Sequence, residues 1–259
     1  MDPDALQRAV DLLRRTRFLL VLTGAGISAE SGIPTFRGKD GLWNRYDPQD
    51  LATPEALQRN PRLVWTWYNW RRGLILQARP NPGHRALADL ERLFGDRFLL
   101  VTQNVDGLHQ RAGSQRVVEL HGNIFQERCL SCGLERQAER VYPEEALPPR
   151  CPRCGGLMRP GVVFFGEMLP TAALDQALAA AQRADTVLVV GTSAVVYPAA
   201  ALPYEVRNHG GRILEVNPRA TPLTPLAEVS LRALAGQVLP ELVRHLQEAD
   251  PLADPRPQG

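Results

Sequence analysis

Short apolar segments that alternate with helical segments constrain the fold of this 259-residue chain most strongly. Each apolar segment has the length of one strand, and the clearest are Phe18–Leu22, Phe98–Val101, Val187–Val190 and Ile213–Val216. Segments with the apolar spacing of helices lie before and between them, at 4–16, 83–94, 171–184 and 199–209. Strands that are apolar on both faces and alternate with helices predict an α/β fold with a Rossmann-like, doubly wound parallel sheet.

Two segments interrupt this alternation and are predicted to form a small second domain. Residues 44–79 are punctuated by prolines and then helical from Pro61 to Gln77, and residues 123–160 contain every cysteine. We expect these two segments to form a helical and zinc-binding domain, inserted into a discontinuous Rossmann-like domain of residues 1–43, 80–122 and 161–259. Because open α/β sheets bind ligands beyond the carboxyl ends of their strands, the active site is expected in the cleft between the domains.

The four cysteines form two Cys-x-x-Cys pairs separated by eighteen residues, Cys129 with Cys132 and Cys151 with Cys154. This is zinc-ribbon spacing, in which four thiolates hold one structural Zn²⁺. Two disulfides are the alternative, but a chain of this size needs no staples and no secretory segment is expected before it. A disulfide within Cys-x-x-Cys is also strained and redox-active. Since four thiolates leave no open position for a substrate, the chemistry is expected elsewhere.

The charge balance and the apolar runs argue against several functions. The 30 basic and 28 acidic residues give a net charge of +2, which argues against a nucleic-acid surface. No apolar run reaches the length of a transmembrane helix. We therefore expect a cytoplasmic protein that binds neither nucleic acid nor membrane. Its oligomeric state is left open, with a monomer expected.

A glycine loop directly follows the first apolar segment. Residues 24–29 fit the pattern Gly-x-Gly-x-x-Gly/Ala, whose glycines let backbone amides approach a pyrophosphate. The acidic strand end that reads the adenosine ribose in hydride-transferring enzymes is missing, because the region that follows is a polar loop in which Asp40 ends no strand. Asn217, after the strand at 213–216, is the more plausible ribose reader. The sequence therefore predicts NAD, held for a reaction other than hydride transfer.

Polar residues that follow two further strands are candidates for the chemistry. Gln103, Asn104 and Asp106 come after the strand that ends at Val101, and such a cluster suits amide and hydroxyl groups better than packing. Helix capping by Asp106 is a simpler interpretation, but it explains only one of the three residues. His121 stands at the end of the strand at 117–120, where an imidazole could act as a base near neutral pH. A hydrogen-bonded structural histidine is the alternative.

Together these motifs resemble those of the sirtuins, which are NAD-dependent protein lysine deacylases. The matching motifs run in family order across nearly the whole chain and comprise Gly24–Arg37, Thr102–Asp106, His121–Asn123, the four cysteines, Val162–Glu167, Gly191–Ser193 and Val216–Pro218. The resemblance implies one structural Zn²⁺, NAD as co-substrate, and acylated-lysine proteins as partners. It also implies that the acyl oxygen attacks C1′ of the nicotinamide ribose, and that nicotinamide, lysine and 2′-O-acyl-ADP-ribose are released.

The resemblance also implies roles for individual residues. His121 takes a proton from a ribose hydroxyl, and Asn104 and Asp106 are the other expected catalytic residues. The residues expected to bind NAD are Gly24, Ala25, Gly26, Ser28, Ala29, Thr35, Phe36, Arg37, Trp43, Gln103, Asn104, Val105, Asp106, His121, Gly191, Thr192, Ser193, Asn217, Pro218, Arg219 and Ala235. The residues expected to bind the acylated peptide are Ala52, Tyr68, Arg71, Val162, Phe165, Gly166, Glu167 and Val195. Residues 165–167 are expected to pair with the peptide as a strand.

A Tyr-x-x-Arg pair suggests which acyl group is removed. Tyr68 and Arg71 share one face of the predicted helix, where a phenol and a guanidinium form a carboxylate receptor. The pair resembles that of class III sirtuins of bacterial type, which remove succinyl and malonyl groups, and Ala52 matches the small residue of their enlarged acyl pocket. For Trp65 and Trp67 in the same helix, packing against the insert is the better interpretation. We expect a desuccinylase and demalonylase that retains deacetylation.

Other functions remain open at this point. The chain could be chiefly a deacetylase, or a mono-ADP-ribosyltransferase that uses the same C1′ chemistry with another nucleophile. A zinc-ribbon binding module is disfavoured by the near-neutral charge and the polar cluster, and an oxidoreductase is disfavoured by the missing acidic strand end. The loop at 30–45 is expected to become ordered around NAD.

Overall fold

The computed structural model describes residues 2–37 and 41–248, so Asp40 and the tail after Asp250 lie outside the described residues. The helices are α1 (Pro3–Arg15), α2 (Pro48–Leu51), α3 (Pro54–Arg59), α4 (Pro61–Gln77), α5 (Pro82–Phe94), α6 (Leu108–Arg111), α7 (Thr171–Arg183), α8 (Leu202–Asn208) and α9 (Ala235–Glu248). The strands are β1 (Leu19–Thr23), β2 (Phe98–Thr102), β3 (Val117–Glu119), β4 (Gly122–Cys129), β5 (Glu135–Gln137), β6 (Met158–Val162), β7 (Thr186–Val190), β8 (Arg212–Val216) and β9 (Val229–Leu231). None of the helices in these described ranges is both long and apolar enough to cross a membrane.

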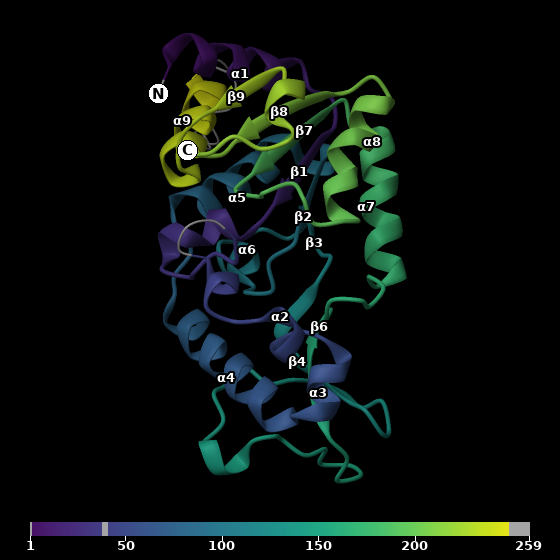
Figure 1. The fold of residues 1–259 in the computed structure, drawn as a ribbon. Coiled ribbons are helices and arrows are strands. Elements are labelled where there is room, and N and C mark those ends of the chain that lie inside the picture. The colour runs from purple at the N-terminus through teal and green to yellow at the C-terminus, as the bar shows by residue number, and fades with distance from the viewer. Residues whose placement is uncertain (1, 38–40, 249–259) are drawn as a thin grey trace, which may run out of the picture.

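Six parallel strands form the main sheet in the order β3-β2-β1-β7-β8-β9 (Figure 1). The chain builds outward from β1 through β2 to β3, then crosses to β7 on the other side of β1 and builds outward to β9. This crossing is the topological switch point of a doubly wound sheet. The α/β fold class predicted from the alternating pattern is therefore confirmed.

Two hydrophobic clusters cover the two faces of this sheet. Side chains alternate along β1, so Leu19 and Val21 pack with α1, α5 and α9, whereas Leu20 and Leu22 pack with α7 and α8. Every residue of β1, β2 and β7 is buried, which explains why these strands read as unbroken apolar runs.

Proline and a short polar cap set the start of α4, the helix that carries the Tyr-x-x-Arg pair. Asn60 accepts a hydrogen bond at Oδ1 from the amide of Leu63, 3.1 Å away, and Pro61 occupies the first helical position, where no amide hydrogen is needed. The helix ends at Gln77, so both predicted ends of this helix are confirmed.

A second, antiparallel sheet in the order β5-β4-β6 packs with α2, α3 and α4 at the far end of the molecule (Figure 1). Its hydrophobic cluster includes Trp65 of α4, Phe125 of β4 and Met158 of β6. The same cluster takes in Ile33 and Leu42, which lie before the predicted boundary at residue 43. The exact domain boundaries therefore stay a prediction. We call residues 123–160, on which α4 packs, the zinc-ribbon module.

One predicted helix begins later than expected. Residues 199–201 form a tighter turn, and α8 starts only at Leu202. Pro203 lies in the first turn of α8, where its missing amide hydrogen costs nothing. The turn and the helix together span nearly the range predicted from the apolar spacing.

Candidate functional site

A cavity of about 550 Å³ lies between the carboxyl ends of the main-sheet strands and helix α4, which packs on the zinc-ribbon module. Its walls come from the loops after β1, β2, β7 and β8, from the residues between β3 and β4, and from one face of α4. This is the position at which open α/β sheets bind ligands, so the predicted location of the site agrees with the structure. The volume is within the range of sites that enclose a cofactor or a drug-sized ligand.

Nearly all residues that the sequence analysis singled out line this cavity. Of the predicted NAD-binding residues only Ser28 is outside the lining, and its buried side chain instead contacts residues of the wall. Of the predicted substrate-binding residues only Val195, whose side chain is exposed to solvent, is outside the lining. The structure thus brings the predicted residues together, while their individual roles remain predictions.

Glycines let the loops after β1 and β7 touch at the switch point. The amide of Gly26 donates to the carbonyl oxygen of Gly191 over 2.7 Å. A Cβ atom on Gly26 would lie only 2.6 Å from that oxygen, and Gly191 itself has a φ of +59°. The glycine pattern therefore serves a close backbone contact between two cavity loops, in addition to any approach of backbone to a phosphate.

The polar cluster after β2 is held by a chain of buried hydrogen bonds. Ser28 Oγ donates to Asp106 Oδ2 at 2.7 Å and accepts from Asn104 Nδ2 at 3.2 Å. Asp106 Oδ1 also accepts from the amide of Leu108 at 2.9 Å, so the capping interpretation is correct as well. Burial raises the pKa of the Asp106 carboxyl, and the bonds from Leu108 and Ser28 oppose this rise.

His84 is a neighbour of this cluster that the sequence analysis missed. Its Nδ1 accepts from the amide of Asn81 at 3.3 Å, which places the ring hydrogen on Nε2, and Nε2 lies 3.4 Å from Ser28 Oγ. Burial lowers the pKa of His84 to about 4, so the ring is neutral at pH 7. The sequence places His84 in the first turn of α5, but this position does not predict its contact with Ser28, which is 56 residues away.

His121 is positioned as a neutral base. Its Nδ1 lies 3.0 Å from the carbonyl oxygen of Gln103, which accepts a hydrogen bond and therefore fixes the ring hydrogen on Nδ1. Nε2 keeps its lone pair available for a proton. Burial lowers the pKa of His121 below its ordinary value, and the bond to Gln103 only partly offsets this, so the ring is uncharged at neutral pH.

Tyr68 and Arg71 form a buried cationic corner of the cavity. The guanidinium of Arg71 lies 4.7 Å from the ring centre of Phe36 and 5.0 Å from that of Trp67. Within residues 2–37 and 41–248, no carboxylate forms an ion pair with Arg71. Burial lowers the pKa of Arg71 and raises the pKa of Tyr68, so the phenol keeps its hydrogen. Arginine stays charged in proteins, and the corner is therefore suited to an anionic ligand group.

The four cysteine sulfurs are arranged for one zinc ion. Cys129 Sγ lies 3.5 Å from Cys154 Sγ, Cys132 Sγ lies 3.6 Å from Cys151 Sγ, and all four sulfurs lie within 4.8 Å of one another. A tetrahedron of thiolates around Zn²⁺ has edges of about 3.8 Å. The amides of Cys132 and Ser131 each donate to Cys129 Sγ at 3.4 Å and lower the pKa of this thiol to about 6. The predicted ligand set is therefore brought together with the right spacing for one zinc ion, and the local amides favour the thiolate at Cys129.

Residues 165–167, which were predicted to pair as a strand with the peptide substrate, form a turn. The carboxylate of Glu167 accepts two hydrogen bonds from Arg159, at 2.6 and 2.9 Å, and one from the amide of Phe164 at 2.8 Å. These bonds bend the chain back on itself, and the amide of Phe165 donates to the carbonyl of Ala52 at 2.8 Å. Pairing of this segment with a peptide stays a proposal.

Sequence reasoning missed several residues of the cavity wall. They are mostly apolar, and comprise Ile33, Pro34, Trp67, Val163, Phe164, Leu169, Val196, Tyr197, Pro198, Val216, Ala220, Thr221 and Leu234. Trp67 could have been found, because it lies one helical turn before Arg71 on the same face. Ile33, Pro34, Val163, Phe164 and Val216 lie within the recognised motifs, and for the others the sequence gives no signal beyond their position near a motif.

Comparison with known proteins adds an independent line of argument. Residues 24–198 match the Sir2 family. The NAD-dependent protein deacylase of Thermococcus kodakarensis is 54% identical over 248 residues, which cover 94% of this chain and 96% of that protein. A Sir2 homologue solved in complex with NAD is 52% identical with a TM-score of 0.88, covering 94% of both chains. A Sir2 structure with a p53 peptide and NAD⁺ is 37% identical with a TM-score of 0.82, covering 94% of this chain and 98% of that one.

Proposed function

The chain belongs to the Sir2 (sirtuin) family and is an NAD-dependent protein deacylase, and we propose that it removes succinyl and malonyl as well as acetyl groups from lysine. The proposed products are nicotinamide and 2′-O-acyl-ADP-ribose. The observation that carries the acyl assignment is the buried guanidinium of Arg71 in the cavity wall, which forms no ion pair with a carboxylate of the described residues. The carboxylate at the end of a succinyl or malonyl group would supply that partner.

Desolvation of the buried Arg71 guanidinium favours an acidic acyl group. A buried charge without a partner is costly, whereas a guanidinium that meets a carboxylate in such a place gains strong, charge-assisted hydrogen bonds. The phenol of Tyr68, which keeps its hydrogen, adds a second donor from the same face of α4. Ala52, whose side chain is small and buried in the cavity wall, leaves room for an acyl chain longer than acetyl.

In the proposed mechanism, residues of three loops have separate roles: the loops after β1 and β2 and the residues between β3 and β4. When bound, NAD supplies the C1′ carbon that is attacked and the nicotinamide that leaves. Asp106 is proposed to accept a hydrogen bond from the nicotinamide carboxamide, and Asn104 to bind a ribose hydroxyl. His121 takes the proton of a ribose hydroxyl at Nε2, because its Nδ1 hydrogen is bound to Gln103. Phe36 covers the ribose and excludes water.

The adenosine and phosphate parts of NAD are assigned to the other walls. Arg37, exposed at the cavity wall, is proposed to neutralise phosphate charge. Asn217 follows β8 and donates from Nδ2 to the carbonyl oxygen of Thr192 at 2.8 Å, which ties together the two loops proposed to hold the adenosine. Gly191, Ser193 and Ala235 complete this part of the lining.

The proposed partners are proteins that carry acylated lysines. The solved Sir2 complex with a p53 peptide supports a peptide substrate. The chain segment at 162–167, with exposed Phe165, lies at the cavity and is the proposed docking site, together with Val195. We propose a cytoplasmic monomer without nucleic-acid or membrane partners, and the near-neutral net charge supports the absence of a nucleic-acid surface.

Exchange of Arg71 for methionine tests the acyl assignment. Methionine keeps the length and the apolar contacts of the side chain but removes the charge. We expect kcat/KM for a succinyl-lysine peptide to fall about 100-fold, because a charge-assisted hydrogen bond is lost, while kcat/KM for the matched acetyl-lysine peptide changes by less than about threefold. Release of free lysine peptide, measured by mass spectrometry, gives both values.

Arg62→Met is the matched control for this variant. Arg62 lies on the same helix, but it donates to Leu147 and Glu144 of the zinc-ribbon module and is absent from the cavity wall. The control should leave both peptides unaffected. An equal loss on succinyl-lysine and acetyl-lysine in Arg71→Met would show that Arg71 does not recognise the acyl carboxylate.

A further inference from the structure

Two faces of helix α4 make different contacts, one with the cavity and one with the zinc-ribbon module. Trp67, Tyr68 and Arg71 line the cavity, whereas Trp65, Asn69 and Arg72 contact the zinc-ribbon module. The second set is spaced by four and three residues, which places these side chains on one face of the helix. The direction in which the first set points is therefore set by what holds the second set.

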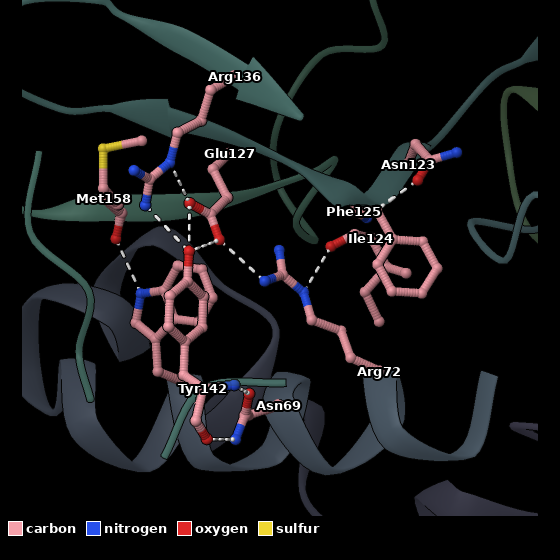
Figure 2. Close-up of polar contacts among 10 residues, drawn as sticks. Asn69, Arg72, Asn123, Ile124, Phe125, Glu127, Arg136, Tyr142 and Met158 are labelled. Carbon is pink, nitrogen blue, oxygen red and sulfur yellow. Dashed lines mark hydrogen bonds and ion pairs between the residues drawn. The ribbon is translucent and has the colours of Figure 1, made fainter. Parts of the chain in front are cut away.

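Directed hydrogen bonds hold the second face, as Figure 2 shows. Trp65 Nε1 donates to the carbonyl oxygen of Met158 on β6 at 2.8 Å. Asn69 forms two bonds with the backbone of Tyr142, donating to its carbonyl oxygen at 2.9 Å and accepting from its amide at 2.7 Å. These bonds fix the position of α4 along its axis and hold it against the module.

The carboxylate of Glu127 is the centre of the network in Figure 2. Arg72 Nη1 donates to Glu127 Oε1 at 2.8 Å, and neither side chain is exposed to solvent. Arg136 donates to Glu127 Oε2 at 2.8 Å, and the Tyr142 hydroxyl donates to the same carboxylate at 2.8 Å. Arg72 Nε also donates to the carbonyl oxygen of Ile124 at 2.8 Å. The guanidinium of Arg72 is thus tied in two directions to β4.

A buried ion pair of this kind specifies orientation more than it stabilises. Apolar side chains of equal volume often give a protein of equal or higher stability, whereas the angular demands of the ion pair hold the two elements in one arrangement. One nitrogen of the guanidinium, Arg72 Nη2, has no hydrogen-bond partner within the described part of the chain. Arg72 therefore forms directed hydrogen bonds to Glu127 and Ile124 and leaves one of its guanidinium nitrogens without a partner among the described residues.

Small rotations of α4 matter for a carboxylate receptor. A guanidinium about 7 Å from the helix axis moves by roughly 1 Å when the helix turns by about 10°. A displacement of about 1 Å is enough to spoil a bidentate contact with a carboxylate, and can cost about 100-fold in rate. An acetyl group has no carboxylate to align. His121 and Asp106 also lie on loops of the main sheet, so they do not turn with α4.

We propose that the Arg72–Glu127–Tyr142 network is the positioning device that sets the acyl preference. It fixes the rotation of α4 so that Tyr68 and Arg71 meet the acyl carboxylate, and thereby makes turnover of acidic acyl-lysines depend on the zinc-ribbon module. Arg72, Glu127 and Tyr142 are positioning residues because none of them lines the cavity. This inference rests on the proposed desuccinylase function.

The test compares steady-state kinetics on matched succinyl-lysine and acetyl-lysine peptides. In Glu127→Gln we expect KM for the succinyl-lysine peptide to rise about tenfold, while kcat on both peptides and KM for the acetyl-lysine peptide stay within about twofold. Tyr142→Phe removes one bond to Glu127 without leaving a buried charge unpaired, and should raise the same KM about threefold. Both variants should retain one zinc ion per chain.

Glu144→Gln is the matched control, because it breaks the exposed ion pair between Arg62 of α4 and the same module. It should change neither KM. If Glu127→Gln does not fold, the Tyr142→Phe variant decides alone. An equal rise of KM on both peptides, or an unchanged ratio of the two KM values, overturns the positioning role and leaves the desuccinylase function standing. Absence of succinyl-lysine turnover by the unaltered protein overturns both.

Discussion

His121→Ala should lower kcat for deacylation about a thousandfold, because a positioned general base contributes about 10² to 10⁴ in rate. NAD affinity should change by less than about threefold, since the ring is one of many contacts in a large cavity. In the proposed sequence His121 acts only after nicotinamide has left. A rapid-quench experiment should therefore still show a burst of nicotinamide, followed by very slow release of lysine peptide.

The pH dependence of kcat gives a second readout of the same residue. The active form of His121 is neutral, and burial lowers its pKa below the ordinary value of 6.5. Activity should therefore be level around pH 7 to 8 and fall on acidification, with the midpoint of the fall below pH 6.5. The acidic limb should vanish from the residual activity of His121→Ala. A loss of less than about tenfold, or an acidic limb that persists in the variant, would contradict the assignment.

Cys129→Ser should abolish zinc binding and unfold the zinc-ribbon module. Structural zinc in small modules contributes about 10 to 16 kcal/mol of apparent binding free energy at pH 7, which far exceeds the stability of such a module alone. Cys129 and Cys151 are buried in the same cluster as Trp65, Phe125 and Met158, so loss of the metal opens the packing that holds α4. Turnover of both acyl peptides should fall at least about 100-fold.

The measurement combines zinc content by atomic emission with thermal unfolding followed by circular dichroism. Ser131→Ala is the control, because it keeps the backbone amide that donates to Cys129 Sγ and removes only a hydroxyl. The control should keep one zinc ion per chain and the original Tm. A Cys129→Ser protein with one bound zinc and an unchanged Tm would refute the four-thiolate site.

Features that depend on residues close together in the sequence, such as the strands, helix α4 and the metal site, could be predicted from local patterns. The strands of the main sheet were visible because they are buried on both faces, and α4 was visible from Pro61 to Gln77 because a proline and a cap start it. The cysteine spacing indicated the metal site for a similar reason, since each pair offers two thiolates from one tight turn. The order of the motifs then predicted about two thirds of the residues that line the cavity.

Long-range contacts set the limit of the prediction. His84 reaches Ser28 across 56 residues, and Glu127 reaches Arg72 across 55. Ile33 and Leu42 pack in the hydrophobic cluster of the antiparallel sheet, although the sequence around them predicts a loop. Residues 165–167 bend into a turn because Arg159 binds Glu167, a pairing that alternation of apolar and polar residues does not encode. Each of these features arises from tertiary packing.

Matched turnover of succinyl-lysine and acetyl-lysine peptides by the unaltered protein, with and without NAD, shows which acyl group the protein removes. We expect that succinyl-lysine is cleaved only with NAD, and at least as efficiently as acetyl-lysine, because Tyr68 and Arg71 offer a buried carboxylate receptor. NAD-dependent cleavage of acetyl-lysine alone would contradict the acyl assignment and leave a deacetylase that uses the same His121 chemistry.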